Sequence, residues 1–346
     1  MKNIVLVGTY PPPYGGVSIF IKRFQHYLKM GGVDVEVFDC LPSKSKKGEN
    51  ILNTSLLKFF FKKSKYNLFH IHSYSAKQKI TFAVKAKLSN AKLIISLHSY
   101  REKPKGLKKL ANVLALKLAD EIWVNNTGIA EEIKHDFNIE NDRLKVIQHY
   151  LHPLPEEIKA INLDYRFETF IKNHGPVLMS SAWKLMDYIG KDLYGFDTCL
   201  ILIKKLKENF NNVGGVLFIG RNDNAQAYQN LIEQIESLEL KDDVLVLDGD
   251  KRTPPYLGKV DLFLRCTLSD SFGASVAESL FVGTPVVASN VCPRPMGCYL
   301  YEVNNIEDLY QKVKGELEKG KINRDGVKKF DDSLAQILER YNILLS

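Results

Sequence analysis

The chain has 346 residues, of which 45% are hydrophobic and 25% charged, and its formal net charge is +8. This composition is that of a globular protein and excludes a collagen-like, coiled-coil, disordered or small secreted chain. About two domains are expected at this length, and no apolar run is long enough to predict a transmembrane helix or a signal peptide. Five scattered cysteines without a C-x-x-C spacing argue against a disulfide framework or a zinc site, and favour a cytoplasmic protein.

The first half of the chain alternates short apolar runs with segments of helical spacing. Strands are predicted at residues 4–7, 33–38, 68–72, 93–97, 122–124 and 144–147, and helices at residues 17–30, 78–88, 107–118 and 128–137. Such alternation is typical of a parallel sheet with right-handed crossovers. We therefore predict a Rossmann-like domain over residues 1–160.

The same alternation restarts after residues 149–175, which have no clean period and are predicted to connect two domains. Strands follow at residues 177–180, 216–219, 244–247, 262–264 and 285–288, and helices at 200–210, 227–238, 275–282, 306–317 and 333–345. We predict a second such domain over residues 170–325 and a helical segment, residues 326–346, that packs back on the first domain. The fold class is α/β, with two Rossmann-like doubly wound domains that face each other across a ligand-binding cleft.

The strongest motif, SDSFGASVAESL, begins at Ser269 and is followed by GTPVVAS. An acid and a Phe-Gly pair open a predicted helix after a strand, and the free N–H groups of a helix N-terminus bind phosphate. Gly273 permits close approach of the backbone, Glu278 could reach a ribose, and Asp270 could reach a sugar hydroxyl. Alternatively, Ser269 or Asp270 caps an ordinary helix and Glu278 is solvated, but this does not explain the Gly-Thr-Pro-Val-Val strand start.

This motif resembles the C-terminal signature of retaining glycosyltransferases with the GT-B fold (glycosyltransferase family 4, group 1 type). The resemblance implies that Asp270 contacts the donor sugar and that Glu278 holds the donor ribose. It also implies that the backbone of Phe272, Gly273 and Ala274 binds the donor phosphates. In such enzymes the second domain binds the donor and the first lies on the acceptor side, which implies these roles for residues 170–325 and 1–160. The first acid of the family is usually Glu, and this chain has Asp at that position.

The loop PPPYGGVS after the first strand resembles the family's N-terminal G-G-V loop. The resemblance implies that Gly15 and Gly16 lie against the donor phosphates, and we place Tyr14 on the acceptor side. His98 ends the predicted strand 93–97, and a lone histidine there is more often structural. The family often has a histidine after such a strand, which implies a catalytic role for His98, and His72 is a weaker acceptor-side candidate.

The cationic residues that the family uses for the donor diphosphate are altered in this chain. Trp183 and Lys184 stand where Arg is usual, and Tyr194 stands where Lys is usual. The resemblance therefore implies that Lys184 offsets the charge of the leaving group and that Arg221 lies near the donor. Because cationic side chains and helix dipoles would do this work, we expect no metal and no cofactor.

We predict a retaining glycosyltransferase that moves a sugar from a nucleotide-diphosphate sugar, most plausibly a UDP-sugar, to an acceptor. The expected acceptor is a saccharide or a polyprenyl-diphosphate-linked saccharide in bacterial surface polysaccharide assembly. The alternatives are a GT-B-fold nucleotide-sugar epimerase and a non-catalytic nucleotide-sugar-binding protein. The sequence Gly273-Ala-Ser-Val-Ala imitates a hydrolase nucleophile elbow, but the predicted strand does not run directly into its serine.

The net positive charge of the chain comes from its first half. Residues 1–150 carry 25 Lys and Arg against 12 Asp and Glu (net +13), whereas residues 151–346 carry 23 against 28 (net −5). Residues 44–117 hold 18 basic residues and only two acids, Glu49 and Glu102. We interpret this stretch as a peripheral contact with the anionic inner face of the cytoplasmic membrane. The absence of any nucleic-acid-binding module argues against a nucleic-acid partner.

Overall fold

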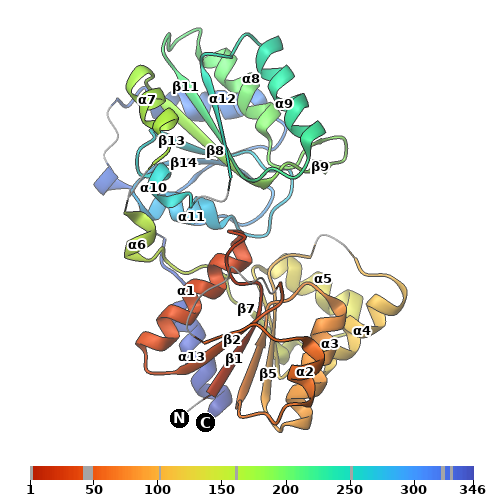
Figure 1. The fold of residues 1–346 in the computed structure, drawn as a ribbon. Helices are drawn as coiled ribbons and strands as arrows, with labels where there is room; N and C mark the ends of the chain where they lie inside the picture. Colours follow the sequence, from red (N-terminus) through yellow and green to blue (C-terminus); the bar gives the residue numbers. More distant parts are fainter. Residues whose placement is uncertain are drawn as a thin grey trace. The chain divides into compact units, whose positions relative to one another are not determined.

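The computed structural model describes residues 3–41, 50–100, 103–159, 163–249, 252–320, 324–327 and 330–346. The chain folds into two compact units, coloured along the sequence in Figure 1. The first unit contains Met1–Leu151 and Asp332–Ser346, and the second contains His152–Asp331. The chain therefore leaves the first unit before the predicted boundary at residue 160, and it returns to that unit for its last helix.

The first unit is built on a seven-stranded sheet in which every pairing is parallel. The strand order is β3-β2-β1-β4-β5-β6-β7. The strands are β1 (Asn3–Gly8), β2 (Asp34–Asp39), β3 (Ile51–Leu52), β4 (Leu68–Ile71), β5 (Lys92–Leu97), β6 (Glu121–Val124) and β7 (Leu144–Val146). The predicted strands are confirmed, and β3 was missed because two residues are too short to show a period.

Helices cover both faces of this sheet (Figure 1). On one face lie α1 (Gly16–Met30) and α13 (Leu334–Leu345), which share a core cluster. On the other face lie α2 (Leu56–Phe61), α3 (Ala76–Leu88), α4 (Gly106–Leu118) and α5 (Thr127–Phe137), which share a second cluster. A 3-10 turn, η1 (Asn141–Arg143), precedes β7.

The second unit is built on a six-stranded parallel sheet with the order β12-β11-β8-β13-β14-β15. Its strands are β8 (Val177–Lys184), β11 (Gly214–Arg221), β12 (Val244–Asp248), β13 (Leu262–Arg265), β14 (Val286–Ser289) and β15 (Tyr299–Tyr301). A small antiparallel hairpin pairs β9 (Asp187–Tyr188) with β10 (Lys191–Asp192).

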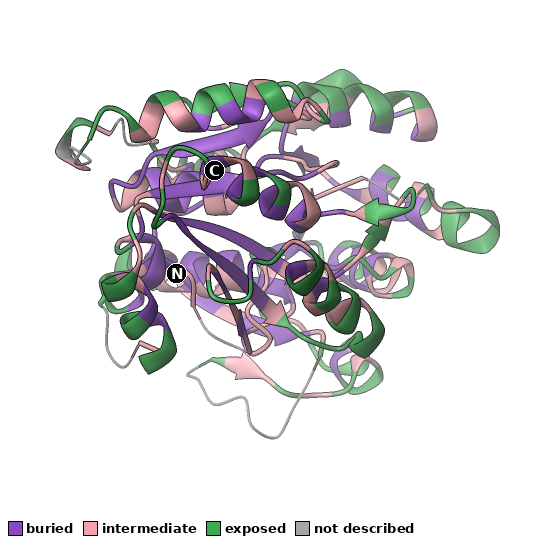
Figure 2. Cartoon of the chain, turned by 90° about the horizontal axis from the view of Figure 1, so that it is seen from above, coloured by how far each residue is buried: buried purple, intermediate pink, exposed green. Residues whose placement is uncertain are grey.

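The helices of the second unit also pack in two layers. One core cluster contains α8 (Phe196–Leu206), α9 (Ala225–Ser237) and α12 (Ile306–Leu317). The other contains α7 (Tyr165–Asn173), α10 (Pro254–Leu257) and α11 (Ala274–Phe281). The short elements α6 (Pro155–Ile158) and η2 (Arg324–Gly326) complete the unit. Figure 2 shows that the central strands of the sheets are buried and that many exposed residues lie on the outer helix surfaces.

Residues 149–175 are not the irregular connection that their sequence predicts. Pro155 occupies the start of α6, where a missing N–H costs nothing, and the Asp164 side chain caps α7. Phe167 and Phe170 of α7 are buried in the core of the second unit. The prediction missed α6, which has only four residues, and also α7, although Phe167, Phe170 and Ile171 follow a helical spacing. No helix in the described part of the chain is long and apolar enough to cross a membrane.

Candidate active site

The carboxyl ends of three neighbouring strands carry polar side chains in the second unit. β8 ends at Lys184, β13 at Arg265 and β14 at Ser289, and the three strands pair in parallel. Parallel strands bring their carboxyl ends to one edge of the sheet, which is where open α/β folds bind ligands. The loop that carries Asp270 and the start of α11 follow β13 directly at this edge.

Asp270 is held by two arginines at this edge. The Nε and Nη2 atoms of Arg265 each donate to Asp270 Oδ2 at 3.0 Å, and Arg294 Nη1 donates to the same oxygen at 2.8 Å. The Asp270 side chain is only 9% exposed. Burial alone would raise the pKa of Asp270, but the two guanidinium groups outweigh it and hold that pKa well below its usual range. Asp270 is therefore a permanent carboxylate that can accept hydrogen bonds but cannot act as a general acid.

Arg265 and Arg294 were not among the residues predicted from the sequence. Arg265 Nη1 also donates to the Ser181 carbonyl at 3.1 Å, and its guanidinium lies 5.2 Å from the ring centroid of Tyr194. The Arg294 side chain is 1% exposed, and its Nη2 donates to Thr267 Oγ1 at 2.9 Å. The two arginines carry two positive charges and Asp270 carries one negative charge, so these three side chains together have a net charge of +1.

One sequence signal could have revealed Arg265. It directly follows the predicted strand 262–264 and precedes the acid of the motif by only a few residues. Charged residues at the carboxyl end of a buried strand are placed where such folds bind ligands. No comparable pattern marks Arg294, which lies in the irregular segment between β14 and β15.

The start of α11 is shaped to receive an anion. Gly273 has φ +94°, and a Cβ atom there would lie 2.7 Å from Arg294 Nη1, so only glycine fits. Ala274 is the first residue of the helix, and the buried Oγ of Ser275 has no hydrogen-bond partner among the described residues. Phe272 is buried, with its ring 5.5 Å from that of Phe330. Free backbone N–H groups, an unused hydroxyl and an adjacent arginine are the components of a phosphate site.

Glu278 lies further along α11 and is only 7% exposed. Its Oε2 accepts a hydrogen bond from Thr253 Oγ1 at 3.3 Å, just before α10 begins. The alternative in which Glu278 is a solvated helix residue is therefore wrong. A buried carboxylate beside a helix start can accept hydrogen bonds from vicinal hydroxyl groups such as those of a ribose.

The other predicted cations lie at the ends of β8 and β11. Lys184 and Arg221 are partners in the parallel register, and Lys184 is half-buried. Arg221 is exposed and pairs with Asp223, with Nε 3.1 Å from Oδ2. Lys191, which begins β10, donates to Asn304 Oδ1 at 3.2 Å. The structure thus engages Arg221 and Lys191 with other protein groups.

The first unit brings together the N-terminal candidates at the start of α1. Gly15 is the N-cap residue, and Gly16, which is exposed, opens the helix. Ser18 Oγ accepts from the Gly15 N–H at 2.9 Å and donates to the Pro13 carbonyl. This hydrogen bonding fixes the loop while Gly16 at the start of the helix stays accessible. Tyr14 beside it is half-buried.

His98 follows β5 and lies against His72, which follows β4. His98 Nε2 is 2.9 Å from His72 Nδ1. Burial lowers the pKa of His98 to about 3 and, with the neighbouring histidines, lowers the pKa of His72, so both rings are neutral near pH 7. His98 is 8% exposed and His72 only 1%. His72 therefore supports the His98 ring, and its burial argues against the predicted acceptor contact.

Two further histidines continue this cluster through a directed chain of hydrogen bonds. Asn125 Oδ1 accepts from the backbone N–H of His149 and lies 2.7 Å from its Nδ1, which must therefore donate. His149 Nε2 then accepts from Ser96 Oγ at 2.8 Å, and Ser96 accepts from His70 Nε2 at 2.7 Å. His70 Nδ1 is left to accept from the Tyr341 hydroxyl at 2.6 Å. The hydrogen bonds thus assign one neutral tautomer to each of these two histidines.

The histidine cluster does not resemble a metal centre. Its rings pack against one another at a tilt, with centroids 4.1 Å apart and planes at 36° for His70 and His72, and 4.2 Å and 34° for His98 and His149. No group of three or more His, Cys, Asp or Glu side chains suited to a metal ion occurs within the described ranges. The nitrogen atoms of His70 and His149 are used in hydrogen bonds to Tyr341, Ser96 and Asn125.

Comparison with known proteins gives two kinds of similarity. Residues 190–324 match the family model described as glycosyl transferases group 1. The whole chain resembles the crystal structure of a glycosyltransferase from Rickettsia africae (18% identity, TM-score 0.73, covering 100% of this chain and 99% of that chain). It also resembles Anabaena HepE in complex with UDP (16%, 0.70, 99% and 100%) and sucrose-phosphate synthase from Thermosynechococcus elongatus (15%, 0.72, 99% and 99%). A search of curated protein sequences finds no significant match.

These similarities confirm the predicted fold class and the resemblance to GT-B group 1 glycosyltransferases. At such low identities the solved structures show the fold, which is the two-unit α/β fold of GT-B glycosyltransferases. The family match is narrower and more specific, because Arg265, Asp270, Glu278 and Arg294 all lie inside it. Residues 190–324 of the second unit therefore resemble the glycosyl transferases of group 1.

Proposed function

We propose that this protein is a glycosyltransferase that uses a nucleotide-diphosphate sugar as its donor. The observation that carries the proposal is the start of α11, where Gly273 and the unused Ser275 hydroxyl lie beside the Asp270–Arg265–Arg294 cluster. Two arginines and one helix N-terminus suit a diphosphate, and buried Glu278 suits a ribose. A UDP-sugar is the favoured donor, because HepE has been crystallised with UDP and with UDP-glucose.

In the proposed reaction the bond between the anomeric carbon and the donor phosphate breaks, and a bond to an acceptor hydroxyl oxygen forms. Negative charge grows on the leaving diphosphate, where Arg265, Arg294 and the α11 N–H groups would stabilise it. Lys184 at the end of β8 would add a further cation. The acceptor proton passes to the leaving phosphate, so no general base is required.

We propose that the reaction retains the anomeric configuration. Asp270, the acid nearest to the helix start, is bound by two arginines, which makes it a poor covalent nucleophile. Retention would then follow from attack on the same face that the diphosphate leaves. The proposed acceptor is a saccharide or a lipid-linked saccharide of a bacterial surface polysaccharide, and His98 would act at the transfer step.

Calorimetric titration with UDP, UDP-glucose, ADP and GDP tests the proposal, followed by NMR of the products with and without saccharide acceptors. Binding of one nucleotide, together with acceptor-dependent release of that nucleotide and an unchanged anomeric configuration, is the expected result. Conversion of the donor without an acceptor would indicate an epimerase. Nucleotide binding without transfer or slow donor hydrolysis would indicate a binding protein. Substitution of His98 by Ala is expected to lower kcat and leave nucleotide affinity unchanged.

A further inference from the structure

Helix α4 of the first unit has apolar side chains on its solvent-exposed face as well as on its buried face. Leu107, Leu110 and Leu114 are 84%, 54% and 46% exposed, and their spacing of three and four residues places them on one side of the helix. Ala115 and Leu116, on other sides of the same helix, are buried in the core. A surface helix usually presents charged residues to water, so a row of three exposed leucines indicates a contact with something apolar.

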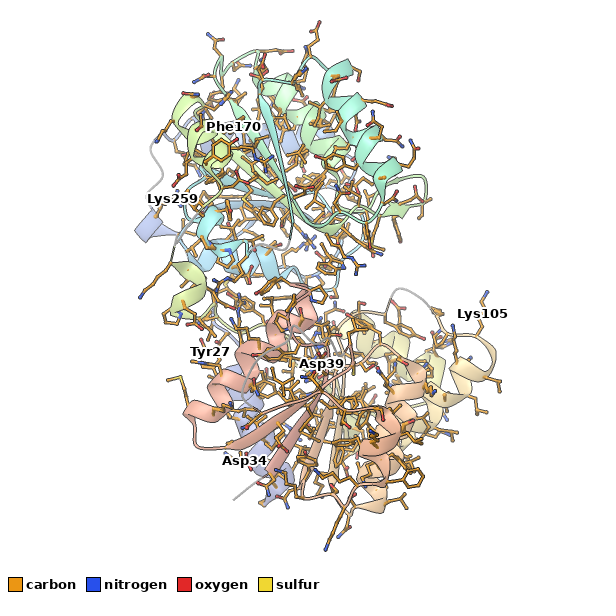
Figure 3. All side chains as sticks on the ribbon, in the orientation of Figure 1. Tyr27, Asp34, Asp39, Lys105, Phe170 and Lys259 are labelled. Carbon is orange, nitrogen blue, oxygen red and sulfur yellow. The ribbon has the colours of Figure 1, made fainter. Side chains whose placement is uncertain are left out.

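Lysines surround these leucines. Lys105, Lys108 and Lys109 lie at the first turns of α4, are exposed, and form no ion pair within the part of the chain that the structure describes. Figure 3 shows the Lys105 side chain pointing away from the first unit. Residues 50–100 and 103–117 contain 14 lysines and no Asp or Glu. The partner of this surface must therefore tolerate or prefer positive charge.

Helix α2 repeats the same combination. Leu57 and Phe61 are 68% and 77% exposed, and Lys58, Lys62 and Lys63 lie beside them. Helix α3 packs against both α2 and α4 on the same face of the sheet (Figure 1). We refer to the exposed residues of α2 and α4 together as the α2–α4 surface.

We propose that the α2–α4 surface docks on an anionic lipid bilayer. Leucine and phenylalanine side chains would enter the boundary between head groups and acyl chains, while lysine ammonium groups meet the lipid phosphates. This inference is linked to the proposed function in one respect: docking on a bilayer would bring the enzyme to a lipid-linked acceptor. Membrane binding itself requires no sugar transfer and is measured separately.

The charge of this surface argues against two other partners. A second copy of the chain would bring the same patch against itself, because a two-fold contact is self-complementary, and unpaired lysines would then face lysines. Single-stranded nucleic acid is usually held by aromatic or arginine side chains that stack on its bases. Exposed leucines offer no such stacking, whereas a bilayer uses both components of the surface.

Co-sedimentation with lipid vesicles tests the proposal on the full chain. Vesicles of phosphatidylcholine alone are compared with vesicles that also contain phosphatidylglycerol, at low and high salt. The wild-type protein is expected to bind the anionic vesicles about tenfold or more tightly than the neutral ones, and salt is expected to weaken that binding.

Two triple variants separate the apolar from the charged component. Leu107→Ser, Leu110→Ser and Leu114→Ser together are expected to lower the partition onto anionic vesicles about tenfold. Lys105→Gln, Lys108→Gln and Lys109→Gln together are expected to do the same and to reduce the salt dependence. The matched controls lie in the second unit and should bind like the wild type: Ile201→Ser, which alters an exposed helical residue, and the charge control K172Q/K241Q/K312Q.

Circular dichroism and urea unfolding, measured in parallel, show whether each variant is folded. Neither measurement needs nucleotide binding, so the test stays independent of the proposed function. Equal binding of the wild type to neutral and anionic vesicles would overturn the proposal. So would patch variants that bind vesicles as well as the control variants do. Concentration-dependent dimerisation that the leucine variant abolishes, without vesicle binding, would assign the surface to a second copy instead.

Discussion

Arg265 contacts a single carboxylate oxygen of Asp270 through two of its nitrogen atoms, Nε and Nη2, both 3.0 Å from Oδ2. Arg294 adds a third donor to the same oxygen at 2.8 Å. Because all three side chains are largely buried, the carboxylate compensates two positive charges that water cannot solvate. The position predicted to contact the donor sugar is therefore also an electrostatic support of the site.

Substitution of Asp270 by Asn is expected to destabilise the second unit by about 3 kcal/mol, because two buried guanidinium groups lose their counter-charge. Urea unfolding monitored by fluorescence measures this change. Asp223→Asn is the matched control: Asp223 pairs with Arg221 in solvent, and its loss is expected to cost about 1 kcal/mol or less. If both variants unfold at the same urea concentration, Asp270 does not support the arginines.

Substitution of Gly273 by Ala is expected to destabilise the protein by about 1–3 kcal/mol and to weaken donor binding. The residue has φ +94°, and the added Cβ would press on Arg294 Nη1 at the start of α11. Gly315→Ala is the control within helix α12, where an added Cβ meets nothing within 4 Å. That variant should gain about 0.5–1 kcal/mol. A Gly273→Ala protein as stable as the wild type would contradict the steric argument.

Substitution of Ser275 by Ala separates binding from stability. The Ser275 hydroxyl is buried at the start of α11 and makes no hydrogen bond with any described residue. Its removal should leave the free energy of unfolding unchanged or slightly higher, since an unsatisfied polar group is lost. If the hydroxyl serves the donor phosphate, nucleotide affinity should fall about fivefold, which is about 1 kcal/mol. Calorimetric titration gives the affinity, and an unchanged value would exclude Ser275 from the phosphate site.

Sequence patterns predicted the strands, loop and helix of the site because each of them is formed by residues that are close together in sequence. The apolar run at 93–97 becomes the fully paired strand β5, and the motif from Ser269 onward folds into a loop and helix α11 as expected. Both depend on residues that are neighbours in sequence, so period and spacing are sufficient to reveal them. The roles of the individual side chains within this framework remain predictions.

The parts that sequence could not reveal depend on contacts between distant residues. Tyr341, on the last helix, completes a hydrogen bond to His70 across 271 positions of the chain. Arg294 reaches Asp270 across 24 positions from a segment without regular structure. His98 was expected to face a ligand, yet its surroundings of three other histidines could not be inferred from the alternation of polar and apolar residues.

The histidine cluster predicts that the first unit loses stability as the pH falls. Burial holds the pKa values of His70, His72 and His149 well below the ordinary 6.5, and that of His98 near 3. The unfolded chain therefore binds protons that the folded chain cannot accept, so the stabilisation is fully present above pH 6.5 and declines toward pH 3. At pH 5.5 each such histidine costs about 1.4 kcal/mol, and four together up to about 6 kcal/mol.

Urea unfolding at a series of pH values between 7.5 and 5 measures this decline, provided that a probe reports on the first unit. Trp123 is suitable, because it is fully buried there and its ring lies 4.6 Å from that of His70. The control variant His135→Gln removes an 89% exposed histidine and should leave the pH dependence unchanged.

Tyr341→Phe should destabilise the first unit by about 1–3 kcal/mol at pH 7.5, because it leaves the acceptor nitrogen of neutral His70 without a donor. Protonation of that nitrogen would remove the unmet acceptor but place a charge in the core. Because burial opposes that charge, the pH dependence of this variant should remain close to that of the wild type. A free energy of unfolding that stays constant from pH 7 to pH 5 in the wild-type protein would show that the four rings are not held neutral by the fold.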